Sequence, residues 1–321
     1  MYFVSSADTS PYINLATEEF LHRKKEAEFC MLWQNSASVI VGRNQNAMAE
    51  IDYEYVTGNN IPVVRRMTGG GAVFHDMGNL NFSYIVNRGE FGDWAGFTKT
   101  LREYLLSLGV VAENSGRNDL VVNGKKISGN AQCVYRGRLL HHGTILVSAD
   151  TKRLSSALKV DKEKIESKGI KSVQSRVTNL DLLIDTDIDN FRAGFEKFIK
   201  ETSEMEEYVL TDAEKAEISK LAEEKYKTYE WNFGYSPKYT FSKKKRFQSG
   251  SIEVYLDIEN GIIESATVYG DFFSVGDCGE VTAALKGIKH SAADMKTILK
   301  NIWPENGAAG ISAEEFLSCL I

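Results

Sequence analysis

The apolar residues in the first half of the chain fall into short runs that are rich in β-branched and aromatic side chains. These runs lie at residues 29–33 (FCMLW), 38–41 (SVIV), 62–64 (PVV), 120–122 (LVV) and 144–147 (TILV). Runs of this length and composition are typical of buried β-strands. The chain must therefore build its core around sheets, with the remaining elements packed against them.

Four further patterns predict helices: an N-cap, a capping box and two apolar repeats of helical spacing. The N-cap is Asn14, and the capping box is Thr211 with Glu214. The repeats are Phe97, Leu101, Tyr104, Leu105 and Leu108, which Gly109 is placed to end, and Phe191, Phe195 and Phe198. Together with the strands they predict an α+β fold in which helices pack on mixed or antiparallel sheets.

The sequence changes character after Trp231. A turn region there leads to the basic run Lys243 to Arg246, and apolar and polar residues alternate from Ile252 up to an Asn260-Gly261 turn. This pattern predicts a β-hairpin, followed by helices near residues 280–288 and 291–302. We expect a large domain at 1–242, a linker at about 243–246 and a small α+β C-terminal domain at 247–321.

Charge and cysteine content exclude several classes of protein. The net charge of -6 and the pI near 5.6 do not favour general binding to nucleic acid or to anionic membranes. The four cysteines are far apart, so neither a disulfide framework nor a structural metal site is expected. The chain lacks a signal-peptide pattern and has no run of 18 apolar residues. We therefore expect a cytoplasmic protein that does not span a membrane.

Residues 65–79 (RRMTGGGAVFHDMGN) hold three consecutive glycines beside a pair of arginines. Glycines let the backbone approach a ligand closely, and successive N–H groups can form an anion-binding nest. Arg65 and Arg66 could supply positive charge in a fork geometry that suits phosphate or carboxylate. The alternative is a flexible loop with solvated arginines. No Walker-type or Rossmann phosphate motif occurs elsewhere in the sequence.

A second polar segment, residues 116–132, contains Asp119 and the adjacent Lys125 and Lys126. Alternation along a strand puts the two lysines on opposite faces, so one can point into a cleft. An exposed Asn-Gly turn with two solvated lysines is the alternative. The same alternation separates His141 from His142, which makes joint metal ligation improbable, and no G-x-S-x-G motif supports a catalytic triad.

Five segments resemble motifs of the lipoate-protein ligases, a family related to biotin ligases and octanoyltransferases. They occur in order along the chain, at residues 39–46 (VIVGRNQN), 65–79, 116–131 (GRNDLVVNGKKISGNA), 141–150 (HHGTILVSAD) and 168–180 (KGIKSVQSRVTNL). WNFGYSP at 231–237 and the sequence from about 247 onward resemble the family's accessory domain. The resemblance therefore covers nearly the whole chain.

The resemblance implies the biotin/lipoate ligase fold for a catalytic domain at 1–242 and an accessory domain at 247–321. It also implies an ATP-dependent, two-step reaction. Lipoate and ATP first give lipoyl-AMP and pyrophosphate, with Mg²⁺ as the counterion of the triphosphate. The lipoyl group then passes to a lysine of an apo lipoyl domain. The implied acceptors are the lipoyl domains of 2-oxoacid dehydrogenase complexes and the glycine cleavage H protein.

The family's functional positions carry over to particular residues of this chain. Lys126, by its place before Ile127-Ser128-Gly129, matches the essential lysine, which would hold two anions together during adenylate formation. Asp119 would contact magnesium or the adenylate, and His75 and Asn79 would line the acyl side of the pocket. The segment that would bind ATP and lipoyl-AMP comprises Arg66, Gly69, Gly70, Gly71, Ala72, Val73 and Phe74, with Arg65 as a further candidate.

Lipoate and octanoate share an eight-carbon skeleton, so burial of the chain at ~0.8 kcal/mol per CH₂ gives little basis for selecting lipoate over octanoate. We therefore expect octanoate to be activated too, unless the pocket binds the dithiolane sulfurs.

One alternative function is an ATP-independent octanoyltransferase or lipoyl amidotransferase with Cys133 as nucleophile. Another is a catalytically silent lipoyl-binding module. We also expect the C-terminal domain to move, with Lys243 to Arg246 as its hinge.

Overall fold

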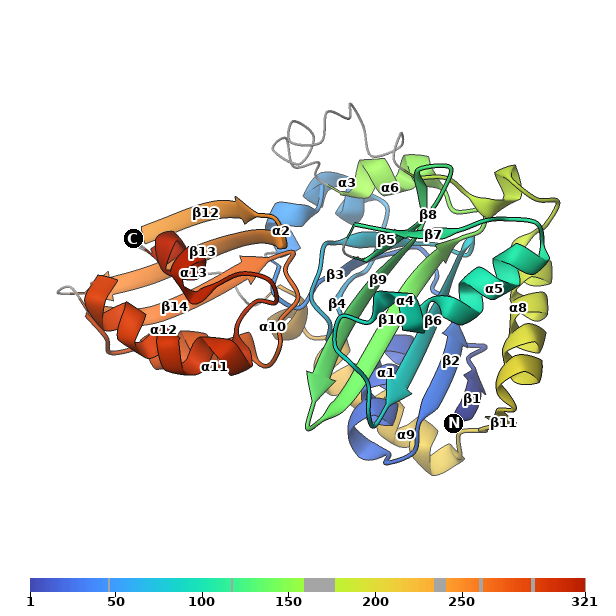
Figure 1. Cartoon of the computed structure of the whole chain (residues 1–321), viewed down its shortest axis with the longest axis horizontal. Coiled ribbons are helices and arrows are strands. Elements are labelled where there is room, and N and C mark those ends of the chain that lie inside the picture. The colour runs from blue at the N-terminus through green and yellow to red at the C-terminus, as the bar shows by residue number, and fades with distance from the viewer. Residues whose placement is uncertain are drawn as a thin grey trace.

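Figure 1 shows a computed structural model of the 321-residue chain. The structure describes residues 1–45, 47–116, 118–158, 177–233, 241–259, 262–289 and 292–320. Within these ranges, a large body of sheets and helices formed by residues up to 233 lies beside a smaller unit that begins at residue 241 (Figure 1). None of the helices in the described part of the chain combines the length and apolar character needed to span a bilayer.

The body is centred on one large sheet. Among the described residues its strand order is β11-β1-β2-β6-β10-β9-β8-β7, with β1 parallel to both of its neighbours and the other pairs antiparallel. The strands are β1 (Tyr2–Ser5), β2 (Phe29–Trp33), β6 (Asn79–Val86), β7 (Glu113–Ser115), β8 (Asp119–Val122), β9 (Lys125–Tyr135), β10 (Arg138–Leu146) and β11 (Glu206–Glu207). The predicted α+β class with mixed sheets is confirmed.

The two faces of the large sheet carry different cores because side chains alternate along each strand. Leu80, Phe82 and Tyr84 of β6 face helices α5 (Lys99–Ser107) and α8 (Ile188–Ser203). Met31, Trp33 and Ile85 face helices α1 (Pro11–Lys24) and α9 (Asp212–Leu221). Both faces are therefore covered, which explains why every residue of β6 is buried.

A small second sheet lies on the α1 side. Its strand order is β4-β3-β5, from β3 (Ser38–Val41), β4 (Val63–Arg65) and β5 (Val73–His75). The triple glycine connects β4 to β5, so it lies at the end of this sheet. The nearby helices are α2 (Ala47–Glu50), α3 (Tyr53–Gly58) and α6 (Thr151–Ala157). The body also contains α4 (Trp94–Phe97), η1 (Leu180–Leu182), η2 (Ala222–Tyr226) and α10 (Tyr229–Asn232).

The C-terminal unit has its own core. Strands β12 (Phe241–Phe247), β13 (Gly250–Glu259) and β14 (Ile262–Gly270) form an antiparallel sheet, and α11 (Cys278–Leu285), α12 (Ala292–Asn306) and α13 (Ala313–Leu320) pack on it. The predicted hairpin and both predicted helices are confirmed; its Asn260-Gly261 turn lies outside the described residues. The linker predicted at Lys243 to Arg246 is wrong, because these residues pair with β13 throughout.

The helix predictions in the body differ in outcome. The repeats at 97–108 and 191–198 form helices, Gly109 follows the first with φ +82°, and the Thr211–Glu214 capping box is present. The predicted N-cap at Asn14 is wrong, since α1 begins at Pro11. The Asn14 side chain is buried instead, and its amide nitrogen donates to the Gln34 carbonyl.

Candidate active site

A cavity of about 130 Å³ lies between the two sheets of the body. The large sheet, the small sheet, helix α1 and the glycine segment all contribute to its wall. The lining residues are Leu15, Trp33, Ile40, Arg66, Gly70, Gly71, Ala72, Val73, His75, Asn81, Asn118, Lys126, Gly129, Asn130, Ala131, His142, Gly143 and Thr144. Six apolar side chains and several polar groups therefore line one cavity, and such a combination can both hold an apolar chain and orient a charged group.

Lys126 reaches this cavity from the start of β9. The preceding β8–β9 turn has positive φ at Asn123 and Gly124, and it leaves Lys125 exposed while Lys126 lines the cavity. This confirms that the two lysines point apart. The Lys126 Nζ lies 2.7 Å from Asp119 Oδ1, which holds it in place. A Cβ at Gly129 would lie only 2.6 Å from Lys126 Nζ, so the glycine provides room for the ammonium.

Arg66 organises the glycine segment from within. Its guanidinium is buried and donates to the carbonyls of Gly69 and Gly71, at 2.6 and 2.9 Å, and to Thr68 Oγ1 at 3.0 Å. Burial lowers the pKa of Arg66 to about 10, so the side chain remains charged near neutral pH. The triple glycine is therefore a structured wall that carries buried positive charge, and the flexible-loop alternative is wrong.

Arg65, the further candidate, has a structural role. It is buried and donates to the backbone carbonyls of Gly42 and Gln45 in the body, and of Trp231 and Asn232 in α10. It does not line the cavity. Arg65 thus ties α10 to β4, and the neighbouring Arg66 is the arginine of the site.

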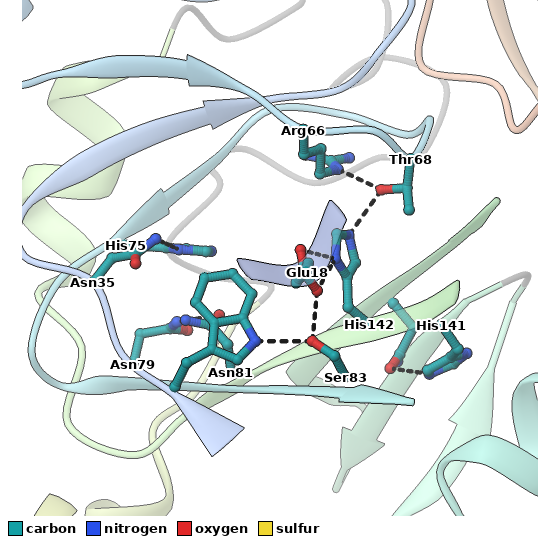
Figure 2. Close-up of polar contacts among 12 residues, drawn as sticks. Glu18, Asn35, Arg66, Thr68, His75, Asn79, Asn81, Ser83, His141 and His142 are labelled. Carbon is teal, nitrogen blue, oxygen red and sulfur yellow. Dashed lines mark hydrogen bonds and ion pairs between the residues drawn. The ribbon is translucent and has the colours of Figure 1, made fainter. Parts of the chain in front are cut away.

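A buried polar network connects Arg66 to His142, and both of these residues line the cavity. Figure 2 shows Thr68 between Arg66 and His142, and Glu18 between His142 and Ser83. The Thr68 Oγ1 to His142 Nε2 distance is 2.8 Å, and the His142 Nδ1 to Glu18 Oε1 distance is 2.9 Å. This order matches a hydroxyl-imidazole-carboxylate triad. Thr68 is fully buried and does not line the cavity, so its hydroxyl cannot reach a substrate and the network fixes the cavity wall.

His75 and Asn81 lie at another part of the cavity (Figure 2). Asn35 Nδ2 is 3.1 Å from His75 Nδ1, and Asn79 Nδ2 donates to Asn81 Oδ1 at 2.8 Å. Desolvation, followed by the charge of Arg66, lowers the pKa of His75 to about 3. The imidazole is therefore neutral, and its polar atoms act as one donor and one acceptor.

The sequence-predicted site residues divide into two groups. Those that line the cavity are Arg66, Gly70, Gly71, Ala72, Val73, His75 and Lys126. Those that do not line it are Gly69, Phe74, Asn79 and Asp119. Phe74 packs in the core between the small sheet and α6, Asn79 is buried beside Asn81, and Asp119 acts on the site through Lys126.

The sequence reasoning missed Trp33, Asn81, Glu18 and the role of His142. One signal for Glu18 was available. Leu15, Glu18 and His22 recur at helical spacing on α1, so a carboxylate falls on the stripe that the helix buries. A buried carboxylate requires a partner, which here is His142. Nothing in the local sequence indicated that partner, because the two residues are 124 positions apart.

Cys133, the nucleophile of the transferase alternative, does not line the cavity. It packs against the core between the large sheet and α1, and desolvation raises the pKa of its thiol to about 12. A thiol must be deprotonated to attack an acyl group. Cys133 is half-buried but lies outside the cavity, and its thiol is protonated near neutral pH, so it lacks the position and the charge state that such an alternative requires.

The C-terminal unit touches the outer side of the glycine segment. Gly70 N donates to the Phe272 carbonyl at 3.1 Å, and the Phe273 ring lies 5.1 Å from the ring of Trp94. None of the described residues of the C-terminal unit lines the cavity. Among the described residues, no group of three or more His, Cys, Asp or Glu side chains is arranged to hold a metal ion.

Comparisons with known families cover most of the chain. Residues 10–200 match the family described as lipoyl protein ligase A/B catalytic domain, and residues 236–320 match bacterial lipoate protein ligase C-terminus. A lipoate-protein ligase of Bacillus subtilis (strain 168) is 40% identical over 330 residues, with all of both chains covered. Lipoate–protein ligase 1 of Staphylococcus aureus (strain Mu50) is 42% identical over 297 residues, with 90% of each chain covered.

Solved structures agree with these matches. The P. falciparum LipL1 structure in complex with lipoate superposes with a TM-score of 0.81 at 24% identity, covering 99% of this chain and 97% of that one. A lipoate-protein ligase A bound with ATP gives a TM-score of 0.61 at 30% identity, covering 73% of this chain and 98% of that one. A bipartite lipoate protein ligase from Thermoplasma acidophilum, described with its E2 lipoyl domain, has a TM-score of 0.63 at 32% identity. The match covers 75% of this chain and 98% of that one. The chain therefore belongs to the lipoate-protein ligase family.

Proposed function

We propose that this protein is an ATP-dependent lipoate–protein ligase that activates lipoate as lipoyl-AMP in the cavity between the two sheets. One observation carries the proposal: Lys126 and the segment from Gly70 to Val73 line the same cavity. The full-length match to lipoate-protein ligases and the likeness to an ATP-bound ligase support it.

In the first step, a carboxylate oxygen of lipoate attacks the α-phosphorus of ATP, and the bond to the leaving pyrophosphate breaks. The two reacting groups are both anions, so they repel one another. We propose that the Lys126 ammonium lies between them and offsets this repulsion, while Asp119 fixes its direction. The backbone of Gly70, Gly71 and Ala72 would lie against the nucleotide, because it offers no large side chain.

In the second step, a lysine amine of the acceptor attacks the acyl carbon, loses a proton and displaces AMP. We propose apo lipoyl domains of 2-oxoacid dehydrogenase complexes and the glycine cleavage H protein as acceptors. The E2 lipoyl domain named with the Thermoplasma acidophilum ligase supports this class of partner. We propose lipoate as the main acyl substrate, with octanoate accepted as well.

Mg²⁺ would balance the charge of the triphosphate. Asp119 lies beside the proposed reacting groups, because its carboxylate is paired with Lys126. Magnesium retains several waters and commonly uses one or two carboxylates with phosphate oxygens. The residues therefore fit an ion held mainly by the nucleotide, with Asp119 as its protein contact.

The free cysteines fit a reducing compartment, and we retain the cytoplasm as the proposed location.

We also propose that residues from Phe241 onward act as an accessory domain that moves between the two steps. The Phe272 carbonyl occupies the Gly70 N–H, which belongs to the segment proposed to meet the nucleotide. A movement of the C-terminal unit would free this donor. Lys243 to Arg246 would move with this unit, since they belong to the C-terminal sheet.

One assay tests the proposed function against its alternatives. The full chain is incubated with ATP, Mg²⁺, lipoate and an apo lipoyl domain, while pyrophosphate and the acceptor mass are followed. We expect pyrophosphate release and a lipoylated acceptor only when ATP is present. Acceptor modification by an acyl donor without ATP would indicate the transferase. Lipoate binding without pyrophosphate release or modification would indicate the silent binding module.

A further inference from the structure

Two buried nitrogen atoms of residues that line the cavity have no hydrogen-bond partner among the described residues. They are the Nε2 of His75, a residue 3% exposed, and the Nδ2 of Asn81, a residue 1% exposed. Both residues line the cavity. Buried polar groups in folded proteins are nearly always hydrogen-bonded, so two unpaired groups at one place indicate a ligand that pairs with them.

The hydrogen-bond network fixes the donor role of His75 Nε2, and the Asn81 amide is oriented by its bond with Asn79. Asn14 Nδ2 donates to Asn35 Oδ1 at 2.9 Å, so the Asn35 amide nitrogen faces His75. It donates to His75 Nδ1, which leaves the proton of the neutral ring on Nε2. Asn79 Nδ2 donates to Asn81 Oδ1, and in this arrangement the Asn81 amide nitrogen and Asn79 Oδ1 are left without a partner among the described residues.

The positions of the strands locate these donors relative to Lys126. Asn81 on β6 pairs directly with Thr144 on β10, and Gly129 on β9 donates to Thr144 Oγ1. The Lys126 ammonium lies over Gly129. Asn81 is therefore two strand spacings from Lys126, or roughly 10 Å. An extended eight-carbon acid spans roughly 9 Å, from C–C bonds of about 1.5 Å. A chain whose carboxylate lies at Lys126 can end at His75 and Asn81.

We propose that His75 and Asn81 bind the dithiolane sulfur at the distal end of lipoate and thereby select lipoate over octanoate. The inference rests on the proposed function, because it takes Lys126 as the position of the carboxylate. The disulfide sulfurs of the dithiolane ring, like other divalent sulfur, are weak hydrogen-bond acceptors, whereas the terminal methyl of octanoate accepts no hydrogen bond. Octanoate therefore leaves two buried donors unpaired, and a site built to hydrogen-bond its substrate rejects an analogue that lacks the acceptor. Both acids enter the cavity, and lipoate binds more tightly.

The test is calorimetric titration of the full chain with lipoate and with octanoate, in the absence of ATP. The variants are Asn81→Leu and His75→Phe, each of which removes one donor and retains most of the side-chain volume. Wild-type protein binds lipoate roughly five- to tenfold more tightly than octanoate, and each variant lowers this ratio to about two or less. Thr144→Val is the matched control. Thr144 lines the same cavity, but its hydroxyl already accepts from Gly129 N, so the ratio of the two affinities remains that of wild type.

A second measurement needs no variant. Octanoate with a terminal hydroxyl carries a stronger acceptor than sulfur at the distal end, so it binds wild-type protein more tightly than octanoate does. The proposal is overturned by equal wild-type affinity for lipoate and octanoate. It is also overturned if both variants fold and retain the wild-type ratio of lipoate to octanoate affinity. A third contrary result is an equal loss of affinity for both acids in the variants, which would place the carboxylate at these donors.

The outcomes separate this inference from the proposed function. Selective binding of lipoate with no pyrophosphate release on addition of ATP contradicts the ligase activity and leaves the role of His75 and Asn81 intact. Pyrophosphate release with equal affinity for the two acids contradicts only that role. If neither acid binds, both proposals fail.

Discussion

At the scale of single residues, two pairs of adjacent, identical residues have one member in the site and the other outside it. Lys125 and Lys126 are adjacent and chemically identical, yet the strand directs one to solvent and the other into the cavity. His141 and His142 differ in the same way: His141 packs against Phe97, and His142 bonds to Glu18. Alternation along β9 and β10 therefore separates a site residue from a neighbour of the same type.

This contrast gives a prediction for the two lysines. Lys126→Ala should lower the rate of lipoate-dependent pyrophosphate release by about 10²- to 10³-fold, because it removes the charge that lies between two reacting anions. Lys125→Ala should remain within about twofold of wild type, since its side chain is exposed. Steady-state kinetics with matched melting temperatures measures both. Equal losses in the two variants would remove Lys126 from its proposed role.

His75 gives a prediction about stability and pH. Its pKa is about 3 in the folded protein, whereas an unfolded histidine titrates near 6.5. Between these values only the unfolded state binds the proton, so this contribution to stability is complete above about pH 6.5 and is lost as the pH falls. Lowering the pH from 7.5 to 5.5 should reduce the free energy of unfolding by about 1 kcal/mol through His75 alone. Denaturant titrations should show a smaller pH effect in His75→Gln; an identical pH effect would contradict the assignment.

At the scale of elements, the segment between β4 and β5 is held by one side chain. Arg66 bonds to the carbonyls of Gly69 and Gly71 on one side and to Thr68 on the other, and Thr68 continues to His142. A planar guanidinium can make these bonds at once because its donors point in fixed directions. The conformation of the glycine segment is therefore coupled to His142, which also lines the cavity.

Arg66→Lys should separate charge from geometry. The ammonium keeps the positive charge but cannot reach the two carbonyls and the hydroxyl together, so the glycine segment should lose its fixed shape. We expect the KM for ATP to rise about tenfold or more, from the loss of one or more buried hydrogen bonds. Thr68→Val, which removes one of the same bonds, should give a smaller rise of the same sign. A wild-type KM for ATP in Arg66→Lys would show that charge alone is sufficient.

At the scale of the whole molecule, the C-terminal unit and the body meet at the glycine segment. A Cβ at Gly69 would lie 2.3 Å from the Phe272 carbonyl oxygen, a distance at which backbone must shift. At Gly71 the nearest atom to such a Cβ is 3.9 Å away, which is ordinary contact. Gly69 and Gly71, two residues apart, therefore differ sharply in their relation to the C-terminal unit.

This difference predicts the behaviour of two matched variants. Gly69→Ala should weaken the contact with Phe272 and increase the rate of limited proteolysis between the body and the C-terminal unit several-fold, because local opening becomes easier. Gly71→Ala should be cleaved at the wild-type rate. Small-angle scattering should show a larger radius of gyration for Gly69→Ala only. If the two variants cannot be distinguished, this contact does not hold the two units together.

The sequence by itself determined the elements and the ordered motifs. Local periodicity identified the main strands and helices, and the spacing around Gly69 to Gly71 and Lys126 identified two segments of the site. It failed at Asn14 and at Lys243 to Arg246, where local composition favoured a cap and a linker. Tertiary contacts decided otherwise: Asn14 has buried partners at Gln34 and Asn35, and β13 pairs with the basic run.

Only the tertiary structure showed which polar groups are paired. Glu18 meets His142 across 124 positions, and the partners of His75 and Asn81 leave one donor unpaired on each. Sequence patterns report the face on which a side chain lies, because backbone periodicity is local. Whether a buried polar group has a partner depends on segments distant in the chain, so it can be known only after the sheets and helix α1 have been packed together.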